Sequence, residues 1–166
     1  MRIMVHIDRG GDNATAIDFY TTLLGHGVSF DVIGLSYYPF WHGPLPKLQQ
    51  NLTDLGPRFG KEIVVVETAY PWTFADPDGG NVLSPGADLQ APYPATPAGQ
   101  LGFLRNLLEI VKGATGGYAR GVVYWEPDWI PGVGWEPGGP DQWDNLTLFD
   151  HTGRALSSVM CFEGER

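Results

Sequence analysis

The sequence has little cysteine and little positive charge. Cys161 is the single cysteine, so neither an intramolecular disulfide framework nor a cysteine metal cluster can form. The chain carries 10 Lys and Arg residues against 19 Asp and Glu, a formal net charge of -9, and has no Lys/Arg cluster. Because such a surface repels phosphate groups and anionic lipid headgroups, we expect no nucleic-acid partner and no membrane partner.

Long apolar runs and nucleotide-binding motifs are also missing. No stretch approaches the roughly 18 apolar residues of a membrane span. Residues 1–4 lead directly into a predicted strand with no signal-like apolar region, which indicates either a protein that stays inside the cell or a chain whose true start has been removed. No G-x-G-x-x-G motif follows a predicted strand and no Walker A motif occurs, which argues against nucleotide binding.

Aromatic residues, glycine and proline are abundant instead. The chain holds 6 Trp, 7 Tyr and 8 Phe together with 23 Gly and 14 Pro, and many of the rings stand beside Pro or Gly in predicted loops. Flat rings in loops suit ligands with flat apolar faces, such as the C–H face of a pyranose. Trp135 and Trp143 lie in Gly/Pro-rich segments, and we interpret them as either site residues or packing lids.

A strand followed by a helix recurs along the chain, which predicts an α/β fold. The length and the 43% hydrophobic content suit one domain over residues 1–166. The unusual residues follow strands rather than helices, and parallel α/β folds place their sites at the carboxyl ends of strands, so we expect a TIM-type barrel or an open doubly wound sheet. The predicted strands are 3–8, 30–36, 62–67 and 121–125; the predicted helices begin near 13, 45 and 97, the first ending at Gly25 or Gly27 and the second at Gly56-Pro57; a turn at 151–153 precedes a short final helix.

Glu67 is the acidic residue that this pattern singles out. Residues 63–66 are β-branched and uninterrupted, the pattern of a parallel strand buried on both faces, and Glu67 ends that run. A carboxylate there lies where solvent meets the end of the sheet. The alternative to a functional role is an ion pair with Lys or Arg at the strand end.

The segment DPDGGN at residues 76–81 is a candidate metal site. Oxygen ligands that alternate around glycine, here Asp76, Asp78 and Asn81, are typical of calcium loops. An Asp/Gly/Asn turn explains the same residues without an ion. We expect calcium at most as a structural ion, and no cofactor that catalysis requires.

Six motifs, spread in order over nearly the whole chain, resemble those of a known enzyme family. They are MVHIDRGGD, FDVIGLSYYPFWHG, RFGKEIVVVETAYPW, YPATPAGQ, GVVYWEPDWIP and WDNLTLFD. The sequence is similar to the C-terminal half of the endo-β-1,4-galactanases of glycoside hydrolase family 53. The resemblance implies half of a (β/α)8 TIM barrel, with the four predicted strands as barrel strands five to eight. It also implies β-1,4-galactan or a galacto-oligosaccharide as the substrate, and a secreted protein.

The resemblance further implies roles for individual residues. Glu67, in VVVET, matches the catalytic nucleophile, and Tyr37 or Tyr38, in SYYP, matches an aromatic residue that hydrogen-bonds the nucleophile. Trp125, in YWEP, matches the tryptophan that lies under the sugar at the cleavage point. The other candidate substrate-binding residues are His6, Asp8, Trp41, Trp72 and Trp129.

Two departures from the family pattern bear on activity. A retaining glycosidase needs two carboxyl groups about 5–5.5 Å apart, and the family's Asn-Glu acid/base pair does not occur in this sequence. The 76–81 segment is one residue and a histidine short of the calcium loop of bacterial galactanases. Because half a barrel leaves two open sheet edges, we expect a homodimer in which a second copy completes the barrel and Glu126 of the partner subunit approaches the place of the acid/base.

Two functions of different classes follow. The chain is a retaining galactanase, or the C-terminal catalytic half of one, with Glu67 as nucleophile. Alternatively, it is an inactive half-barrel scaffold that at most binds β-galactan weakly.

Overall fold

The computed structural model describes residues 1–90, 92–133 and 138–163, and Trp135 lies outside these ranges. The chain forms two compact units. The first comprises Met1–Thr68 and Leu107–Tyr124, and the second comprises Ala69–Asn106 and Trp125–Arg166. The single half-barrel domain over residues 1–166 stays a prediction.

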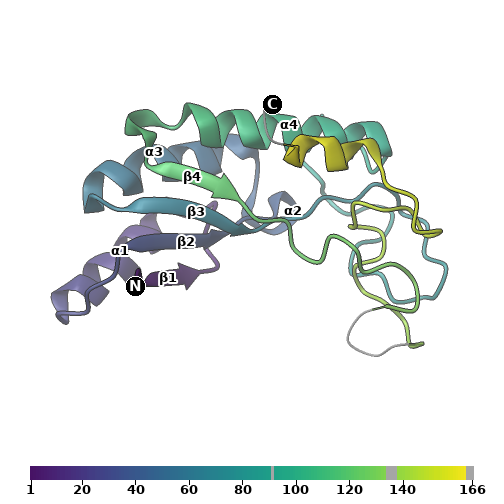
Figure 1. The fold of residues 1–166 in the computed structure, drawn as a ribbon, viewed down its shortest axis with the longest axis horizontal. Coiled ribbons are helices and arrows are strands. Elements are labelled where there is room, and N and C mark those ends of the chain that lie inside the picture. The colour runs from purple at the N-terminus through teal and green to yellow at the C-terminus, as the bar shows by residue number, and fades with distance from the viewer. Residues whose placement is uncertain (91, 134–137, 164–166) are drawn as a thin grey trace. The chain divides into compact units, whose positions relative to one another are not determined.

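Within the described residues, the first unit is built on a parallel sheet of four strands (Figure 1). The strand order follows the order of the strands in the sequence, without a reversal. A doubly wound sheet reverses its strand order partway and a barrel does not, so this order favours the barrel type of the two predicted folds. The strands are β1 Met4–Ile7, β2 Val32–Ser36, β3 Glu62–Glu67 and β4 Ala119–Val122.

Helices connect the strands, as the sequence predicts. Asp12 begins the first helix by accepting a hydrogen bond from the Thr15 backbone N–H at 3.1 Å. No helix among the described residues is long and apolar enough to cross a membrane. The α-helices are α1 Asn13–Gly25, α2 Pro39–His42, α3 Leu45–Phe59 and α4 Pro97–Gly113, and the 3-10 helices are η1 Thr115–Gly117 and η2 Ser157–Phe162.

The prediction that Gly56-Pro57 ends the second helix is wrong. α3 continues through Pro57 and stops at Gly60, whose φ of 62° is a left-handed conformation that glycine adopts without steric cost. Gly56 instead marks a close approach, because a Cβ at this position would lie 2.5 Å from the Cβ of Tyr118. The glycine therefore serves the packing of α3 against the segment that leads into β4.

Two further differences concern the segments around β2 and β4. The aromatic segment after β2, expected as a loop, forms the one-turn helix α2. β4 begins earlier than the predicted 121–125, because Ala119 already pairs with Ile63 of β3. Inter-strand pairing, rather than local content of valine and aromatic residues, therefore decides where this strand starts.

The two faces of the sheet are covered unequally. Ile63 and Val65 of β3 are fully buried, whereas Val64 and Val66 on the opposite face are half-buried, so the prediction that this strand is buried on both faces is wrong. The reason is that α1 and α3 pack on one face: the Tyr20 hydroxyl of α1 donates to the Val5 and Gly34 carbonyls, and α3 contacts both α1 and β3.

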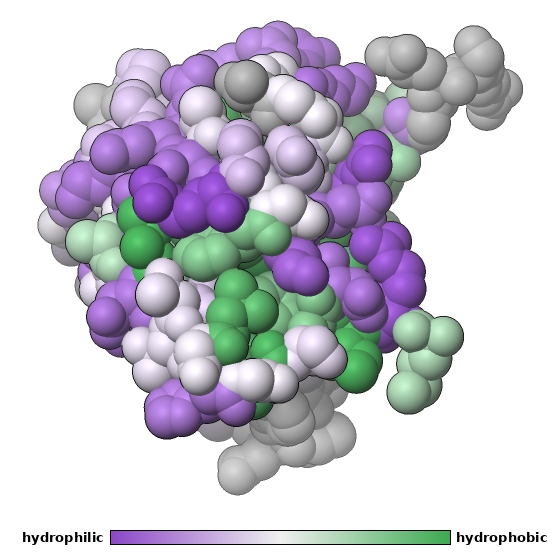
Figure 2. Space-filling view, turned by 90° about the vertical axis from the view of Figure 1, so that its left-hand side faces the viewer, coloured by the Kyte–Doolittle hydropathy of each residue, from purple (hydrophilic) through white to green (hydrophobic). Residues whose placement is uncertain are grey.

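Apolar side chains are also exposed along the edges of the sheet. Ile3 and Met4 at the β1 edge are 48% and 43% exposed, and Val123 after β4 is 52% exposed. Apolar surface lies open between polar residues on the face of the molecule drawn in Figure 2. An exposed parallel edge of this kind offers unpaired backbone groups to a further strand.

The second unit consists mainly of long irregular segments. One buried side chain of α4 joins two of them to η2: Gln100 Nε2 donates to the Tyr70 and Thr147 carbonyls, each at 2.8 Å, and Gln100 Oε1 accepts from the Ser158 hydroxyl at 2.5 Å. Tyr70 also stacks on Phe103 of α4, with ring centroids 4.3 Å apart. A buried polar network and aromatic stacking thus organise a unit that has little regular secondary structure.

Candidate functional site

Three polar side chains meet at the carboxyl end of the sheet in the first unit. His6 lies in β1, Ser36 ends β2 and Glu67 ends β3. After a shift in register, Ser36 pairs with Glu67, and His6 Nε2 lies 2.7 Å from Ser36 Oγ. Sheet pairing therefore assembles residues from three strand–helix units at the end where parallel α/β folds carry their sites.

The carboxylate of this cluster belongs to Glu67, and its two oxygens face different partners. The Tyr38 hydroxyl donates a hydrogen bond to Glu67 Oε2 at 3.1 Å, and His6 Nε2 lies 4.0 Å from Oε1. The Glu67 side chain is 25% exposed, so it stays accessible to a ligand. Burial, followed by the charge of Glu67, raises the pKa of Tyr38, which therefore acts as a neutral donor. Such a donor orients the carboxylate without adding a charge.

The structure distinguishes between the two tyrosines of SYYP. Tyr37 is fully buried, and its hydroxyl donates to the Gly43 carbonyl at 2.7 Å. Its backbone N–H donates to the Glu67 carbonyl at 2.9 Å, which secures the end of β3. Tyr38 rather than Tyr37 is thus the residue whose side chain reaches the Glu67 carboxylate.

Asp8, Trp41 and His42 lie around this cluster. Asp8 Oδ1 lies 2.9 Å from His42 Nε2, and the His42 side chain is only 10% exposed. Trp41 is 53% exposed and meets the ring of Tyr38 edge-on, with centroids 5.1 Å apart. An exposed indole held by a neighbouring ring has the form of a sugar-stacking platform, and the substrate-binding roles of Asp8 and Trp41 stay predictions.

The other predicted substrate-binding residues belong to the second unit. Trp72 Nε1 donates to the Asp144 carbonyl at 3.2 Å, and the Trp72 ring packs against His151 with centroids 4.7 Å apart. Trp125 and Trp129 are half-buried. Their contacts with a ligand stay predictions.

Glu126 follows Trp125 in the second unit and has two unusual properties. Its backbone φ is 46°, a value that residues other than glycine rarely adopt and that is often found at functional sites. Burial, and then the nearby carboxylates of Asp128 and Asp141, raise its pKa. A raised pKa is the property that a general acid requires near neutral pH.

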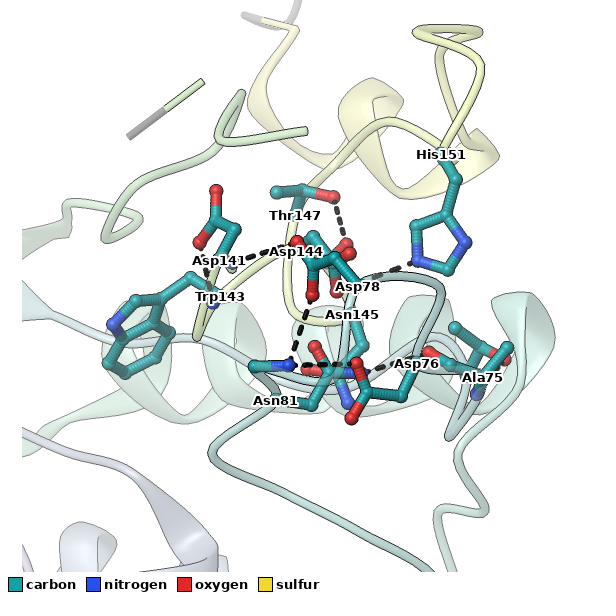
Figure 3. Close-up of polar contacts among 12 residues, drawn as sticks. Ala75, Asp76, Asp78, Asn81, Asp141, Trp143, Asp144, Asn145, Thr147 and His151 are labelled. Carbon is teal, nitrogen blue, oxygen red and sulfur yellow. Dashed lines mark hydrogen bonds and ion pairs between the residues drawn. The ribbon is translucent and has the colours of Figure 1, made fainter. Parts of the chain in front are cut away.

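The second unit also contains an acidic cluster around the 76–81 turn (Figure 3). Asp76 Oδ1 accepts from the backbone N–H groups of Gly79 and Gly80 at 2.8 and 3.1 Å. Asp78 Oδ2 accepts from the Asp141 backbone N–H at 2.8 Å, which connects the turn to a segment far along the chain. The Asn81 side chain donates to the Ala75 carbonyl at 2.9 Å. The 76–81 segment therefore does form a turn of the predicted Asp/Gly/Asn kind.

Asp144 is the most deeply placed carboxylate of this cluster. Its side chain is fully buried, and neither of its oxygens has a hydrogen-bond partner in the described part of the chain. Among the described residues, His151 Nε2 lies 3.6 Å from Asp144 Oδ1, beyond hydrogen-bond distance, and burial lowers the pKa of His151. Burial, with repulsion from Asp78, Asp141 and Asp76, raises the pKa of Asp144 to about 7. This geometry strongly disfavours an ionised Asp144 unless a cation is supplied.

Other oxygens of the same cluster are also buried without a hydrogen-bond partner in the described residues. Asp141 Oδ2, Asn81 Oδ1 and Asn145 Oδ1 are buried and lack a hydrogen-bond partner within the residues described. Buried oxygens without partners are rare in folded proteins and indicate an ion, a water molecule or a proton. Within the described ranges, no three His, Cys, Asp or Glu side chains form a metal-binding group by themselves. A cation here would therefore also need amide and carbonyl oxygens, which calcium accepts.

Sequence reasoning missed Asp141, Asp144 and His151, because they lie far along the chain from the 76–81 turn. The available signal was the pair of aspartates in PDQWDN, but only the fold brings that segment to the turn. For His42 the sequence left two interpretations open, a structural histidine and a sugar contact, and neither includes its bond to the Tyr38 backbone. A one-turn helix returns its ring to the residues at the end of β2.

The comparisons with known proteins all lead to the same family. The sequence profile of glycosyl hydrolase family 53 matches residues 1–162. An arabinogalactan endo-beta-1,4-galactanase of Cellvibrio japonicus is 41% identical over 145 residues, which cover 83% of this chain and 37% of that protein. A protein of Niallia circulans described as an uncharacterized protein in the bgaB 5' region is 52% identical over 160 residues, which cover 95% of this chain and 44% of that protein.

A solved structure leads to the same assignment. The GH53 catalytic domain of Ignisphaera aggregans superposes with a TM-score of 0.89 at 38% identity, over 98% of this chain and 46% of that chain. The relatives are thus covered over less than half of their length, and the fold is that of half of a TIM barrel. The chain belongs to glycosyl hydrolase family 53.

Proposed function

We propose that this chain is the C-terminal catalytic half of a retaining endo-β-1,4-galactanase, with Glu67 as the nucleophile. The observation that carries the proposal is the placement of the Glu67 carboxylate: it ends β3, accepts a hydrogen bond from Tyr38 and remains accessible. The relatives named as galactanases support galactan as the substrate class. Because galactan is a polymer that must be met outside the cell, we also infer that the protein acts after export.

The chemistry assigns one task to each group of the first unit. In a retaining mechanism, an ionised carboxylate attacks the anomeric carbon and a protonated carboxyl group about 5–5.5 Å away releases the leaving group. Glu67 supplies the attacking oxygen. Tyr38, as a neutral donor, holds Oε2 and leaves Oε1 as the attacking atom. His6 and Ser36 line the same end of the sheet, where they can hydrogen-bond sugar hydroxyls.

The acid/base carboxyl group has to come from elsewhere, because the Asn-Glu pair is absent from the sequence. We assign this role to Glu126 of a second copy in a symmetric dimer that pairs the open edges of the two sheets. Three observations favour this residue: the exposed apolar edges of the sheet, the unusual backbone of Glu126 and its raised pKa.

Mixing two variants tests the dimer directly. Glu67→Gln and Glu126→Gln should each be inactive alone. In a two-fold dimer whose sites combine Glu67 of one copy with Glu126 of the other, an equal mixture should regain about a quarter of the activity of the unaltered chain. No recovery after subunit exchange, or a monomeric mass in solution, would contradict this assignment.

The hydrolysis itself is tested with linear β-1,4-galactan. The unaltered chain should release reducing ends with retention of anomeric configuration, and Glu67→Gln should release none above background. Equal release by both proteins would end the catalytic hypothesis. A second function, weak galactan binding by an inactive scaffold, is favoured by the missing Asn-Glu pair. Binding of galactan without any hydrolysis would identify that function.

We further propose that the acidic cluster holds a structural calcium ion. The residues of the cluster fit calcium, because they offer carboxylate and amide oxygens, several of them buried and without a hydrogen-bond partner among the residues that the structure describes. Asp76, Asp78 and Asn81 come from the predicted loop, and Asp144 and Asn145 come from the second segment. The ion would neutralise the cluster and join the two segments, with no part in the bond-breaking step.

Calcium binding is measured by calorimetry on the EDTA-treated protein. The unaltered chain should bind one calcium ion, and Asp144→Asn should bind far more weakly. Asp18→Asn, at an exposed position of α1, is the matched control and should bind like the unaltered chain. Equal binding by all three proteins would contradict the site.

A further inference from the structure

Both ring nitrogens of His42 have polar partners from different segments of the first unit. Its Nδ1 lies 2.9 Å from the backbone nitrogen of Tyr38, and its Nε2 lies 2.9 Å from Asp8 Oδ1. The ring is nearly buried, whereas the Asp8 side chain is 63% exposed. His42 therefore connects the segment after β1 with the segment after β2, and its partner Tyr38 in turn reaches the Glu67 carboxylate.

These contacts determine where the proton of the His42 ring lies. A backbone N–H can only donate, so Nδ1 must carry a lone pair toward Tyr38. In a neutral ring the proton is then on Nε2, and that nitrogen donates to Asp8 Oδ1. Burial lowers the pKa of His42 and nearby Asp8 opposes this effect, with Arg9 acting in the same direction as burial. The carboxylate partner thus selects the tautomer whose free lone pair faces the Tyr38 backbone.

His42 also holds Tyr38 from the other side. The His42 backbone N–H donates to the Tyr38 carbonyl at 2.8 Å, so both backbone polar groups of Tyr38 bond to the same residue. Tyr38 has extended backbone angles at the start of α2, and its hydroxyl is at the far end of a long rigid side chain. A small rotation of the Tyr38 backbone would therefore displace the hydroxyl from Glu67 Oε2.

We propose that His42 is a positioning residue: its Nδ1, held as an acceptor by the Asp8 contact at Nε2, fixes the backbone of Tyr38 and thereby the hydrogen bond from Tyr38 to Glu67. This role rests on the proposed function in one respect, namely that Glu67 is the nucleophile. The hydrogen-bond chain itself is a property of the chain that is measured without substrate.

Two amide variants of His42 separate its two ring nitrogens. Asparagine places its amide oxygen near the position of Nδ1 and keeps the acceptor for Tyr38, but it does not reach Asp8. Glutamine extends toward the position of Nε2 and keeps a donor for Asp8, but it offers no acceptor close to the Tyr38 N–H. Tyr38→Phe is the reference that removes the hydroxyl, and His26→Gln, at the exposed end of α1, is the matched control.

Carbon-13 NMR of Glu-labelled protein is the measurement. The Glu67 side-chain carboxyl resonance, assigned with Glu67→Gln, should move in Tyr38→Phe. His42→Gln should move it in the same direction and most of the way. His42→Asn should move it only slightly, and His26→Gln should leave it in place. The unaltered chain should also show a scalar coupling across the hydrogen bond from the Tyr38 nitrogen to His42 Nδ1.

Three results would overturn the role. The first is a Glu67 resonance that His42→Gln leaves in place while Tyr38→Phe moves it. The second is an equal displacement by His42→Asn and His42→Gln. The third is the absence of the scalar coupling, which decides the question even if a variant does not fold.

Kinetics adds a readout that depends on the proposed function. In a preparation that hydrolyses galactan, His42→Gln should lower kcat about 10- to 100-fold with little change in KM. The reason is that the substitution displaces the nucleophile but leaves the residues that bind the sugar in place. If the unaltered chain does not hydrolyse galactan, the proposed function fails while the NMR results still decide the role of His42. A normal kcat in His42→Gln would contradict the role.

Discussion

The buried carboxylate of Asp144 leads to a prediction about the stability of the calcium-free protein. Asp144 is fully buried, both of its oxygens lack hydrogen-bond partners in the described residues, and its pKa is raised from 3.8 to about 7. In the unfolded chain the same group ionises near its ordinary pKa. The perturbation is Asp144→Asn, which keeps the shape of the side chain and stays neutral at every pH.

The sign and the size follow from linkage between protonation and folding. Between the two pKa values the folded protein keeps a proton that the unfolded chain has lost, so stability falls as pH rises through this window and changes no further above it. A difference of about three pKa units corresponds to about 4 kcal/mol, at about 1.4 kcal/mol per unit. For a chain of this size each kcal/mol shifts Tm by about 2–4 °C. At pH 8, in EDTA, Asp144→Asn should therefore be more stable than the unaltered chain by up to about 4 kcal/mol.

The assay compares the thermal unfolding of the two proteins by circular dichroism in EDTA at pH 4 and pH 8. The advantage of Asp144→Asn should be small at pH 4 and large at pH 8, and the difference between the proteins cancels other titrating groups. Calcium at pH 8 should then stabilise the unaltered chain more than Asp144→Asn. Parallel changes of Tm with pH in EDTA would refute the reasoning, because Asp144 would then ionise freely or have a partner.

Three further predictions concern residues of the first unit, with one control variant in the second. Gly56→Ala should lower the unfolding free energy by about 1–3 kcal/mol, because the new Cβ would collide with Tyr118. Gly102→Ala in α4 is the control: a Cβ makes ordinary contacts there, so this variant should raise the unfolding free energy by about 0.5–1 kcal/mol. Equal effects of the two variants in urea unfolding would contradict the close approach of Gly56 and Tyr118. Tyr20→Phe should cost about 1–2 kcal/mol, since the strand carbonyls that accept from its hydroxyl lose a partner, and an unchanged urea midpoint would contradict this. Because burial lowers the pKa of His42, the unfolded chain takes up a proton at this residue first as pH falls, so the contribution of His42 to stability should decrease from about pH 6.5 downward. The unfolding free energy of the unaltered chain minus that of His42→Asn should therefore decrease over this range, because the opposite pH dependence of Asp144 cancels in the difference, and a constant difference would contradict the reasoning.

Much of the fold could be predicted from local sequence signals. The four strands and the three long helices lie close to the predicted positions, because β-branched runs and capping residues act over a few positions. The errors arose where a distant segment intervenes. Gly56 suggested a helix end but serves close packing against Tyr118, and the start of β4 depends on its pairing with β3.

The features of the candidate site also fall into two groups, those set by neighbouring residues and those set by contacts between distant segments. The sequence by itself determined that Glu67 ends a strand, that aromatic residues follow the strands and that the motifs resemble one glycosidase family, because these are properties of neighbouring residues. Only the tertiary structure decided that Tyr38 rather than Tyr37 reaches Glu67, that His42 holds Tyr38, and that Asp144 lies buried beside the 76–81 turn. Such contacts depend on strand register, on the return of a one-turn helix and on the meeting of distant loops, and none of these distances is encoded in the spacing of residues along the chain.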